Sequence, residues 1–570
     1  MKNLLTLTLL SFFGTTTLAQ TLPGMAAYEY LQNERHRADK IVGETDKPPL
    51  DSLKKADKIL ADALTYYDRP DIQALAKANK YLFARKGDIL FDRSVVQLKT
   101  GQTEAAVQSL LYDLQGDGAA FYASFIDEQE VFEPIRKHAQ LAPLLSKLLA
   151  DSRVFGSSAL KTAYKVNISE DEKVAGLSKL WSEAKYNFVY FNHVPDLDWD
   201  KLYLQYLPKV KATTSTAAYY RVLQSFYANL HDGHTNVSPS STALADSVAR
   251  RPPIRAILVE DKVLVQDVQH DSLIRSGIRP MLEIVSIDGL PVRDYADRFV
   301  RPYVAASSEQ NRDVNTYAYD LLKGPKDRPV TLVFRDAGGA TFSRTLPRTG
   351  YGALKQLPTF QFKILPGNIA YVQVTEFESD KGLQGFKAKF DSIAATNALI
   401  IDVRLNGGGN SANGWNILGY LTDKPMKTGS YASRLYSPLR RARGEGVVFE
   451  DVEGGNTWKP NGKFLYTKPV VVLTSGRTFS AAEDFAVVFD DMKRGKIIGE
   501  PTGGSTGQPL SFDLPGGISA RVCAKRDMYP DGTEWNGKGI QPTILVRPKI
   551  ADLQAGRDTV LEAALSQLRK

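Results

Sequence analysis

The sequence predicts a multidomain α+β protein, and three observations carry this prediction. The chain has 570 residues, a length at which about three or four domains are typical. Hydrophobic residues recur at helical spacing in its first part, short β-like runs fill its middle part, and strands alternate with helices in its last part. The composition, 43% hydrophobic and 24% charged, is that of a globular protein, and the net charge of +8 is not gathered with aromatic residues into a nucleic-acid-binding patch.

Residues 1–19 predict a signal peptide. Lys2 supplies a positive start, Leu4 to Phe13 form a short apolar core, and Ala19 ends a small-residue cleavage site. The apolar run is too short to span a bilayer, and no later run is long enough. We therefore expect an exported protein, periplasmic or secreted, with no integral membrane segment after this peptide is removed.

Residues 24–155 are expected to form a helical domain. Segments such as DSLKKADKILADALTYY and TEAAVQSLLYDLQ carry apolar residues at three- and four-residue steps. Alternating helices of this kind resemble tetratricopeptide hairpins, which suggests a surface for a protein partner. Residues 156–245 continue the helical pattern and are expected to be the helical first part of the next domain.

Residues 251–349 change to short β-like runs with tight turns. AILVEDKVLVQDV and RPVTLVFRDAGGATFSRTL each predict a hairpin. The strings Ser276-Gly277-Ile278 and Ile287-Asp288-Gly289 are similar to the pattern of PDZ domains. That similarity implies a PDZ-like β domain, a fold that holds a peptide by adding it to a sheet edge, although the sequence has no GLGF-type carboxylate-binding loop.

Residues 355–550 are expected to form an α/β core with an open sheet, and residues 551–570 a C-terminal helix. Val470–Leu473 predicts a strand buried on both faces, and helical spacing resumes at about Ser480. A serine at such a strand–turn–helix junction presents its hydroxyl beside the N–H groups of the first helical turn, where an oxyanion is stabilised. Ser480 to Glu483 also fit a capping box, so a purely structural role for Ser480 is the alternative.

His234 is the second candidate for chemistry. Gly233 is typical of a helix end, so His234 is expected just beyond a helix, at the start of an extended segment. An imidazole suits a general base because its ordinary pKa lies close to neutrality. From its position alone, however, His234 is more typical of an ordinary turn histidine than of a catalytic one.

Four pieces occur together in a fixed order: DGHT at Asp232–Thr235, the PDZ-like region, IIDVRLNGGG at Ile400–Gly409 and TSGRTFSAAE at Thr474–Glu483. This combination resembles the tail-specific (C-terminal processing) proteases of peptidase family S41, over about residues 160–550. The tricorn core protease and the interphotoreceptor retinoid-binding protein repeats belong to the same group. The resemblance implies that the core is related to the ClpP/crotonase type.

The resemblance also implies roles for individual residues. Ser480 is the expected nucleophile, and the amides of Ala481 and Gly408 are the expected oxyanion donors. One branch of the family activates the serine with a lysine, but Ser505 stands at that position in this chain. The tricorn-like branch uses a histidine, and the DGHT string makes His234 the expected general base.

Two further groups are expected to support the site. Asn536 stands where tricorn-like members have a glutamate that orients the histidine, and Glu534 lies two positions away. Asp402, Arg404 and Asn406 are expected to brace the NGGG loop. A simple flexible turn is the alternative for that loop.

These features predict an exported serine endopeptidase that cleaves polypeptides through an acyl-enzyme. A catalytically silent ligand- or peptide-binding protein on the same fold is the alternative, and a scaffold that acts through the N-terminal helices is a third possibility. The sequence has no metal-ligand spacing such as H-E-x-x-H and no dinucleotide fingerprint, so no metal or cofactor is expected. Its single cysteine, Cys523, excludes an intramolecular disulfide and is expected to be a packed thiol.

Overall fold

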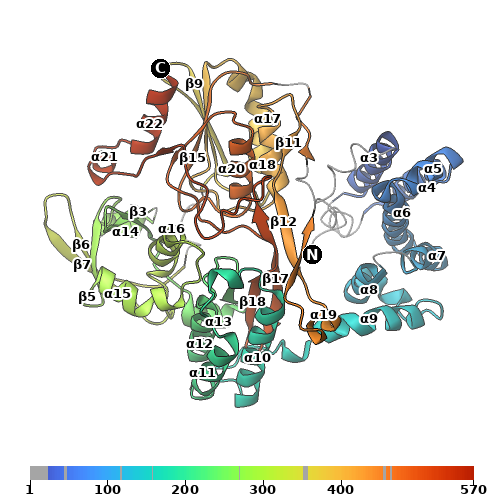
Figure 1. Cartoon of the computed structure of the whole chain (residues 1–570), viewed down its shortest axis with the longest axis horizontal. Coiled ribbons are helices and arrows are strands. Elements are labelled where there is room, and N and C mark those ends of the chain that lie inside the picture. Colours follow the sequence, from blue (N-terminus) through green and yellow to red (C-terminus); the bar gives the residue numbers. More distant parts are fainter. Residues whose placement is uncertain are drawn as a thin grey trace. The chain divides into compact units, whose positions relative to one another are not determined.

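The computed structural model describes residues 24–43, 48–115, 119–156, 158–268, 270–350, 357–452, 457–462 and 465–569 (Figure 1). The expected signal peptide, residues 1–19, lies outside the described residues. The chain divides into two compact units at residue 158, and each is described here by itself. The whole is a multidomain α+β protein, with a helical N-terminal region followed by mixed sheets, as the sequence predicts.

The first unit is helical throughout its described part. Its helices are α3 (Met25–Val42), α4 (Leu50–Tyr67), α5 (Pro70–Lys77), α6 (Lys80–Lys99), α7 (Thr103–Asp113), α8 (Ala119–Glu128), η2 (Glu130–Ile135), α9 (Ala142–Gly156) and η3 (Ser158–Leu160). Two apolar clusters hold these helices together, and α6 belongs to both. Ile89 and Val96 pack with α3, α4 and α5, whereas Phe91 and Val95 pack with α7, α8 and α9.

The second unit begins with helices that pack on a small antiparallel sheet. The helices are α10 (Glu170–Asn187), η4 (Phe191–His193), α11 (Trp199–Lys211), α12 (Thr216–Ala228) and α13 (Thr242–Val248). The sheet has the order β1-β18-β17, from β1 (Asn236–Pro239), β17 (Pro509–Leu514) and β18 (Ile518–Cys523). Residues 156–245, which were expected to be the helical first part of the next domain, share their core with two strands from far along the chain. Cys523 is buried in that core, as expected of a packed thiol.

A second sheet follows, with the order β2-β3-β4-β6-β7 and β5 paired to β4. Its strands are β2 (Arg255–Val259), β3 (Lys262–Asp267), β4 (Glu283–Ile287), β5 (Leu290–Pro291), β6 (Val330–Arg335) and β7 (Thr341–Leu346). The helices beside them are α14 (Asp271–Arg275), α15 (Val292–Phe299), η5 (Arg301–Tyr303), α16 (Glu309–Asp313) and the π-helix η6 (Val314–Asp320). Both hairpins that the sequence predicts are present, β2–β3 and β6–β7.

The last part contains the main sheet, whose order is β20-β16-β15-β10-β9-β8. Its strands are β8 (Phe360–Leu365), β9 (Ile369–Val374), β10 (Ala398–Asp402), β15 (Val470–Thr474), β16 (Lys496–Gly499) and β20 (Ile544–Leu545). All neighbours pair in parallel except β8, which runs antiparallel to β9. The carboxyl ends of the five parallel strands therefore meet at one edge, which is where functional groups gather in open sheets.

Helices cover both faces of this sheet (Figure 1). One face packs on α17 (Lys381–Ala394), α18 (Ser411–Leu418) and α20 (Ala481–Asp491), and the other packs on α22 (Thr559–Leu568). The C-terminal segment was expected to be one helix, but it divides into α21 (Ile550–Gln554) and α22 because Gly556 adopts a φ of 72° that ends the first.

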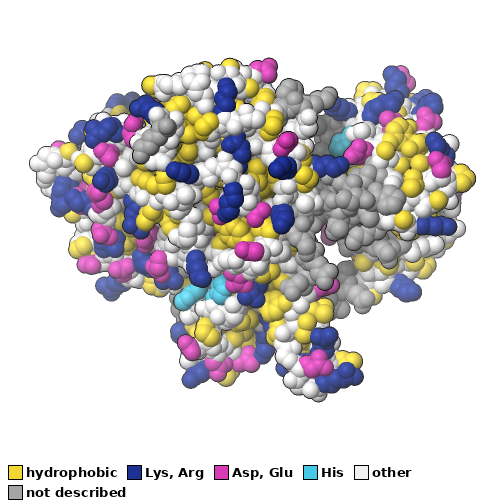
Figure 2. Space-filling view, turned by 45° about the horizontal axis from the view of Figure 1, so that its top comes forward, with side chains coloured by type: hydrophobic (Ala, Val, Ile, Leu, Met, Phe, Trp, Pro, Cys, Tyr) yellow, Lys and Arg dark blue, Asp and Glu magenta, His cyan; other side chains and the backbone are white. Residues whose placement is uncertain are grey.

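Short elements complete the second unit: β11 (Met426–Lys427), β12 (Ser430–Leu435), α19 (Pro438–Ala442), β13 (Val448–Val452), β14 (Thr457–Trp458) and β19 (Arg526–Met528). Among the described residues, none of the helices combines the length and the apolar character needed to cross a bilayer. On the face that Figure 2 shows, Lys and Arg side chains lie scattered among Asp and Glu. The excess positive charge is therefore spread thinly on that face.

Candidate active site

Ser480 stands at a sharp turn between a buried strand and a helix. Every residue of β15 is buried, and α20 begins at Ala481, so both elements lie where the sequence predicts them. Ser480 is the N-cap of α20, and its backbone has φ 56° and ψ −127°, a conformation that a residue with a Cβ rarely adopts. A strained serine at a strand-to-helix turn is the arrangement of a nucleophile elbow, which lifts the hydroxyl clear of the backbone.

His234 faces this hydroxyl from a different part of the chain. It lies between α12 and β1, and its Nε2 is 3.1 Å from Ser480 Oγ. The helix before it ends at Ala228 and not at Gly233, which does not adopt the left-handed conformation of a helix stop. The ring stacks on Phe479 with the ring centres 4.7 Å apart and an angle of 10° between the planes. Gly233 permits this approach, because a Cβ there would lie 2.9 Å from Phe479 Cζ. The stacking fixes the plane of the imidazole against the turn that carries Ser480.

Ser505 occupies the other side of the imidazole. His234 Nδ1 lies 2.8 Å from Ser505 Oγ, and that hydroxyl donates to Asp232 Oδ1 at 3.2 Å. Since the Ser505 proton points to Asp232, its oxygen accepts from Nδ1–H, and Nε2 is left without a proton toward Ser480. The arrangement is a chain of four side chains, Ser480, His234, Ser505 and Asp232 in that order.

The sequence analysis missed this part of the site. It treated Ser505 only as the residue at an empty lysine position, and it gave Asp232 no role. The available signals were a hydroxyl at the position of an expected base and an acid two residues before the histidine. Neither signal is specific, because only the folded chain brings the hydroxyl to His234 Nδ1 and the acid to that hydroxyl.

Asp232 is itself held in place by hydroxyls. It is 1% exposed, and besides Ser505 it accepts from Ser307 at 3.0 Å and from Thr235 at 2.7 Å. Burial raises the pKa of this carboxyl, and the three hydroxyl hydrogen bonds oppose that rise.

The surroundings of His234 favour its neutral form. Burial first, and then the positive charges of Arg521 and Lys525, together lower the pKa of His234 to about 3. The imidazole is therefore uncharged at neutral pH and can accept a proton. A low pKa also makes it a weaker base than an exposed histidine.

The two expected oxyanion donors differ in availability. The structure shows no hydrogen bond from the Ala481 N–H to any described residue. Gly408 lies against Ser480, since a Cβ on it would be 2.7 Å from Ser480 Cβ, but its N–H donates to Asn406 Oδ1 at 2.9 Å. An oxyanion can use the Gly408 amide only by replacing the Asn406 oxygen. Asn406 thus braces the glycine loop, as expected, and in doing so occupies the amide predicted to bind the oxyanion.

Glu483 joins the Ser480 turn to the loop that carries Ser505. Its buried carboxylate accepts from the N–H of Ser480 at 3.2 Å, of Gly504 at 2.7 Å and of Ser505 at 2.9 Å, and from the Thr502 hydroxyl at 2.5 Å. Burial raises the pKa of Glu483 to about 7, against the effect of these hydrogen bonds. Glu483 therefore serves the helix cap, as expected, and also fixes the position of Ser505.

Asn536 lies near this loop but not on the histidine. The neighbouring Gly537 N–H donates to Gly504 O at 2.8 Å. No hydrogen bond joins Asn536 to His234 in the described part of the chain, and the buried Nδ2 of Asn536 has no partner there. Ser505 thus stands at Nδ1, where the orienting group was expected. Glu534 pairs with Arg526 and lies 3.5 Å from His193 Nε2.

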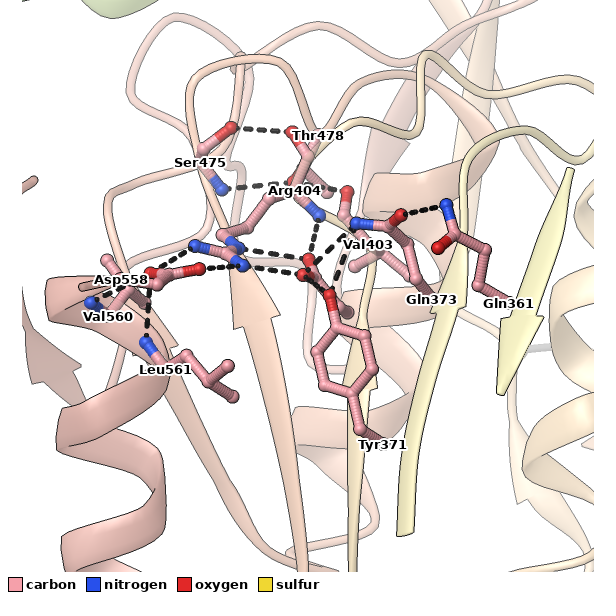
Figure 3. Close-up of polar contacts among 11 residues, drawn as sticks. Gln361, Tyr371, Gln373, Val403, Arg404, Ser475, Thr478, Asp558, Val560 and Leu561 are labelled. Carbon is pink, nitrogen blue, oxygen red and sulfur yellow. Dashed lines mark hydrogen bonds and ion pairs between the residues drawn. The ribbon is translucent and has the colours of Figure 1, made fainter. Parts of the chain in front are cut away.

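A charged network braces the loops beneath the site (Figure 3). Arg404 binds the fully buried Asp402 at 2.6 Å and Asp558 at 2.7 Å, so it ties the end of β10 to the start of α22. Tyr371 donates to Asp402 at 2.6 Å. The Ser475 hydroxyl donates to Arg404 O at 2.7 Å, which fastens the turn after β15 to the same network. Asp402 and Arg404 thus brace the end of β10, and these contacts are not made to the NGGG loop itself.

The chain is similar to known peptidases. Residues 368–546 match the model of "Peptidase family S41". The chain is 28% identical over 245 residues to the "C-terminal processing peptidase, chloroplastic" of Tetradesmus obliquus, which covers 40% of this chain and 49% of that protein. It is 22% identical over 294 residues to the "Carboxy-terminal processing protease CtpA" of Bacillus subtilis, covering 50% of this chain and 54% of that protein. The chain thus spans about half the length of the curated relatives it matches.

A solved structure shares the fold. The structure of "mature CPAF complexed with lactacystin" superposes with a TM-score of 0.57 at 16% identity, over 70% of this chain and 98% of that one. The family match contains Ser480, Ser505, Gly408 and Asn536, whereas His234 and Asp232 lie before it.

Proposed function

The chain belongs to peptidase family S41 through residues 368–546, and from this premise we propose that it is an exported serine endopeptidase that cleaves polypeptides. Ser480 is the nucleophile and His234 the general base. The observation that carries the proposal is the 3.1 Å contact between His234 Nε2 and the hydroxyl of a serine held in a strained turn.

In this mechanism His234 Nε2 takes the Ser480 proton as the hydroxyl oxygen attacks the scissile carbonyl. The Ala481 N–H supports the developing oxyanion, and the Gly408 N–H joins it once the Asn406 side chain turns away. One such donor is typically worth about 3 kcal/mol of transition-state stabilisation. His234 then passes its proton to the leaving amine, and water releases the acyl group from Ser480 by the same route in reverse.

Ser505 and Asp232 act through His234. Ser505 keeps the ring in the tautomer that leaves Nε2 free, and the Asp232 carboxylate stabilises the imidazolium that forms. The tetrahedral intermediate therefore forms between His234 and the oxyanion donors.

The finer parts of the proposal rest on sequence patterns. Residues 1–19 support export to the periplasm or the exterior, and residues 24–155 support a partner-binding helical domain of tetratricopeptide type. The strings around Gly277 and Gly289 support a PDZ-like role for residues 251–349, and the alternating strands and helices of the core support a relation to the ClpP/crotonase type.

A catalytically silent binding protein is the second candidate, and two observations favour it. The Gly408 amide is occupied by Asn406, and the pKa of His234, about 3, makes the ring a weak base. Against it stands the continuous contact from Ser480 to Asp232, which a binding protein does not need.

Hydrolysis of casein, which is unstructured, tests the proposal. The protein from Gln20 to Lys570 is compared with Ser480→Ala and His234→Asn, and with Ser511→Ala and His231→Asn as matched controls at exposed positions. Asparagine suits the His231 control because that residue has a φ of 50°. Both site variants should lose at least about a thousandfold in kcat/KM, and both controls should keep the parent's rate. A parent that cleaves nothing would favour the binding protein, and an active His234→Asn would place the base elsewhere.

A further inference from the structure

A cavity of about 390 Å³ adjoins the candidate active site. Three lining residues form its boundary with the site: Gly233, Gly407 and Phe479. They are the sequence neighbours of His234, Gly408 and Ser480, respectively. A side chain or chain end close to the scissile bond would enter this cavity, because its walls include the neighbours of both His234 and Ser480. The inference that follows rests on the proposed peptidase function.

Positive side chains dominate the charged lining of this cavity. Four cationic residues line it, Arg251, Lys323, Arg477 and Arg521, against the single acid Asp320. That acid is already paired with Lys323 at 2.5 Å. The cavity therefore presents an excess of positive charge beside the reacting groups.

Two of the arginines keep unused hydrogen-bond donors. The Nε atoms of Arg477 and Arg521 are buried and have no partner among the described residues. Arg477 does donate through Nη1 to Gln266 at 3.2 Å, which fixes that end of its guanidinium. A buried donor without an acceptor costs about 1–3 kcal/mol, so a ligand that supplies the acceptor gains by relieving this cost.

Arg521 also has a fixed place relative to the catalytic histidine. It lies on β18 opposite Asn236 of β1, two residues from His234. Burial lowers the pKa of Arg521, and the negative charge of Asp232 opposes that change. Asp232 already accepts hydrogen bonds from three hydroxyls, so its oxygens do not use up the donors of Arg521. Arg521 can therefore bind a second anion.

We propose that this cavity binds a carboxylate of the polypeptide substrate, with Arg521 as the main partner and Arg477 as the second. Guanidinium groups suit this task because their donors match the two oxygens of a carboxylate. The carboxylate comes either from an Asp or Glu side chain or from the free C-terminus of the polypeptide.

Binding of a carboxylate there also changes His234. The positive charge of Arg521 is one cause of the lowered pKa of His234. A bound carboxylate offsets that charge, so the imidazole becomes a stronger base when the preferred substrate is in place. Recognition and catalysis are coupled through one arginine.

Cleavage of randomised short peptides tests the proposal, with one set made as C-terminal acids and one as C-terminal amides. Cleavage sites are read by mass spectrometry for the parent, Arg521→Gln and Arg477→Gln. Arg335→Gln is the matched control, because Arg335 lies on β6, pairs with Glu283 and does not line the cavity. Enrichment of Asp or Glu at one subsite in both sets identifies a side chain, and cleavage of the acid set alone identifies the C-terminus.

The expected result is a preference for the carboxylate that falls at least about tenfold in Arg521→Gln and less in Arg477→Gln, with Arg335→Gln like the parent. A parent that enriches neither Asp nor Glu at any subsite and cleaves the acid and amide sets equally overturns the proposal. So does a preference that both cavity variants retain. Thermal unfolding of each variant verifies that it is folded. If Arg521→Gln does not fold, Arg477→Gln still tests the proposal.

A binding measurement separates this proposal from the proposed function. The Ser480→Ala protein is titrated into labelled peptides that carry Asp or Asn at the enriched position, or at every position in turn if the parent cleaves nothing. Tighter binding of the Asp peptides, lost with Arg521→Gln, supports the carboxylate site even if hydrolysis fails. The same peptides are also compared as C-terminal acids and amides, where tighter binding of the acids that is lost with Arg521→Gln gives equal support. Equal binding in both comparisons overturns the proposal even if hydrolysis succeeds.

Discussion

Ser505 Oγ lies 2.8 Å from His234 Nδ1, although the two residues are 271 positions apart in the sequence. The same hydroxyl donates to Asp232, so it connects the histidine to a buried acid that does not touch the ring itself. A hydroxyl in this position orients the imidazole and transmits the effect of a charge. Its contacts are with His234 and Asp232, so Ser505 acts through the histidine and is a positioning residue.

Replacement of Ser505 tests that role. Ser505→Ala should lower kcat by about tenfold to a hundredfold with little change in KM, because a misplaced ring slows the proton transfer and not substrate binding. Ser505→Thr, which keeps the hydroxyl, should recover most of the loss. The measurement is steady-state hydrolysis of a peptide identified from casein.

Asn536→Ala is the comparison for this experiment. Since the structure places Ser505 and not Asn536 at Nδ1, the Asn536 variant should lose less of kcat than Ser505→Ala. A larger loss in Asn536→Ala would return the orienting role to that residue. A Ser505→Thr variant as slow as Ser505→Ala would mean that the hydroxyl serves packing alone.

The pH dependence should follow the low pKa of His234. The ring stays neutral well below its ordinary pKa of 6.5, because its folded value is about 3. The acid limb of kcat/KM, which reports the free enzyme, should therefore have its midpoint below pH 6.5. Arg521→Gln should move that limb to higher pH, since it removes one of the charges that lower the pKa. A midpoint at or above pH 6.5 in the parent would contradict the prediction.

The free energy of unfolding should also depend on the protonation of His234. Between pH 6.5 and about 3 the unfolded chain binds a proton at His234 and the folded chain does not. The contribution of His234 is thus complete above pH 6.5 and is lost as the pH falls through this window, at up to about 1.4 kcal/mol per pH unit. The free energy of unfolding in urea is measured for the parent and for His234→Asn across this pH range, and the difference between their two pH curves gives the contribution of His234. Parallel curves for the two proteins would rule it out.

Glu483→Gln should weaken both the fold and the site. The amide keeps the shape of the side chain, but its NH₂ group would face donors that now find a carboxylate oxygen. The free energy of unfolding should fall by about 1–3 kcal/mol, and kcat should fall because Ser505 loses its anchor. Glu450→Gln, at an exposed position on β13, is the matched control and should change neither quantity. Denaturant unfolding and peptide hydrolysis give the two values.

Arg404→Met should destabilise the core. The change leaves the fully buried Asp402 without its cation and frees Asp558 at the start of α22. Loss of one partner of a buried ion pair typically costs about 3–5 kcal/mol. The double variant Asp402→Asn/Arg404→Met should recover part of this cost, because it removes the unpaired charge as well. A double variant less stable than Arg404→Met would show that Asp402 is stabilised by its other hydrogen bonds.

The sequence by itself determined the local elements around each candidate residue. The apolar run at Val470 and the helical spacing after Ser480 depend on neighbouring residues only, so the strand, the turn and the helix follow from periodicity. The helix before His234 follows from periodicity in the same way, although it ends at Ala228 and not at Gly233. The place of Gly408 beside the nucleophile is consistent with the family resemblance, since a Cβ on it would lie 2.7 Å from Ser480 Cβ.

Only the tertiary structure decided which of these residues meet and what their polar groups do. β1 pairs with β18, and this pairing sets His234 against Ser480 across 246 residues of chain. The partner of Nδ1 is Ser505, and the Gly408 amide donates to Asn406, because hydrogen bonds in a buried site go to whichever group the packing brings within reach. Periodicity carries no information about such contacts, which is why the sequence indicated Asn536 and an open glycine amide.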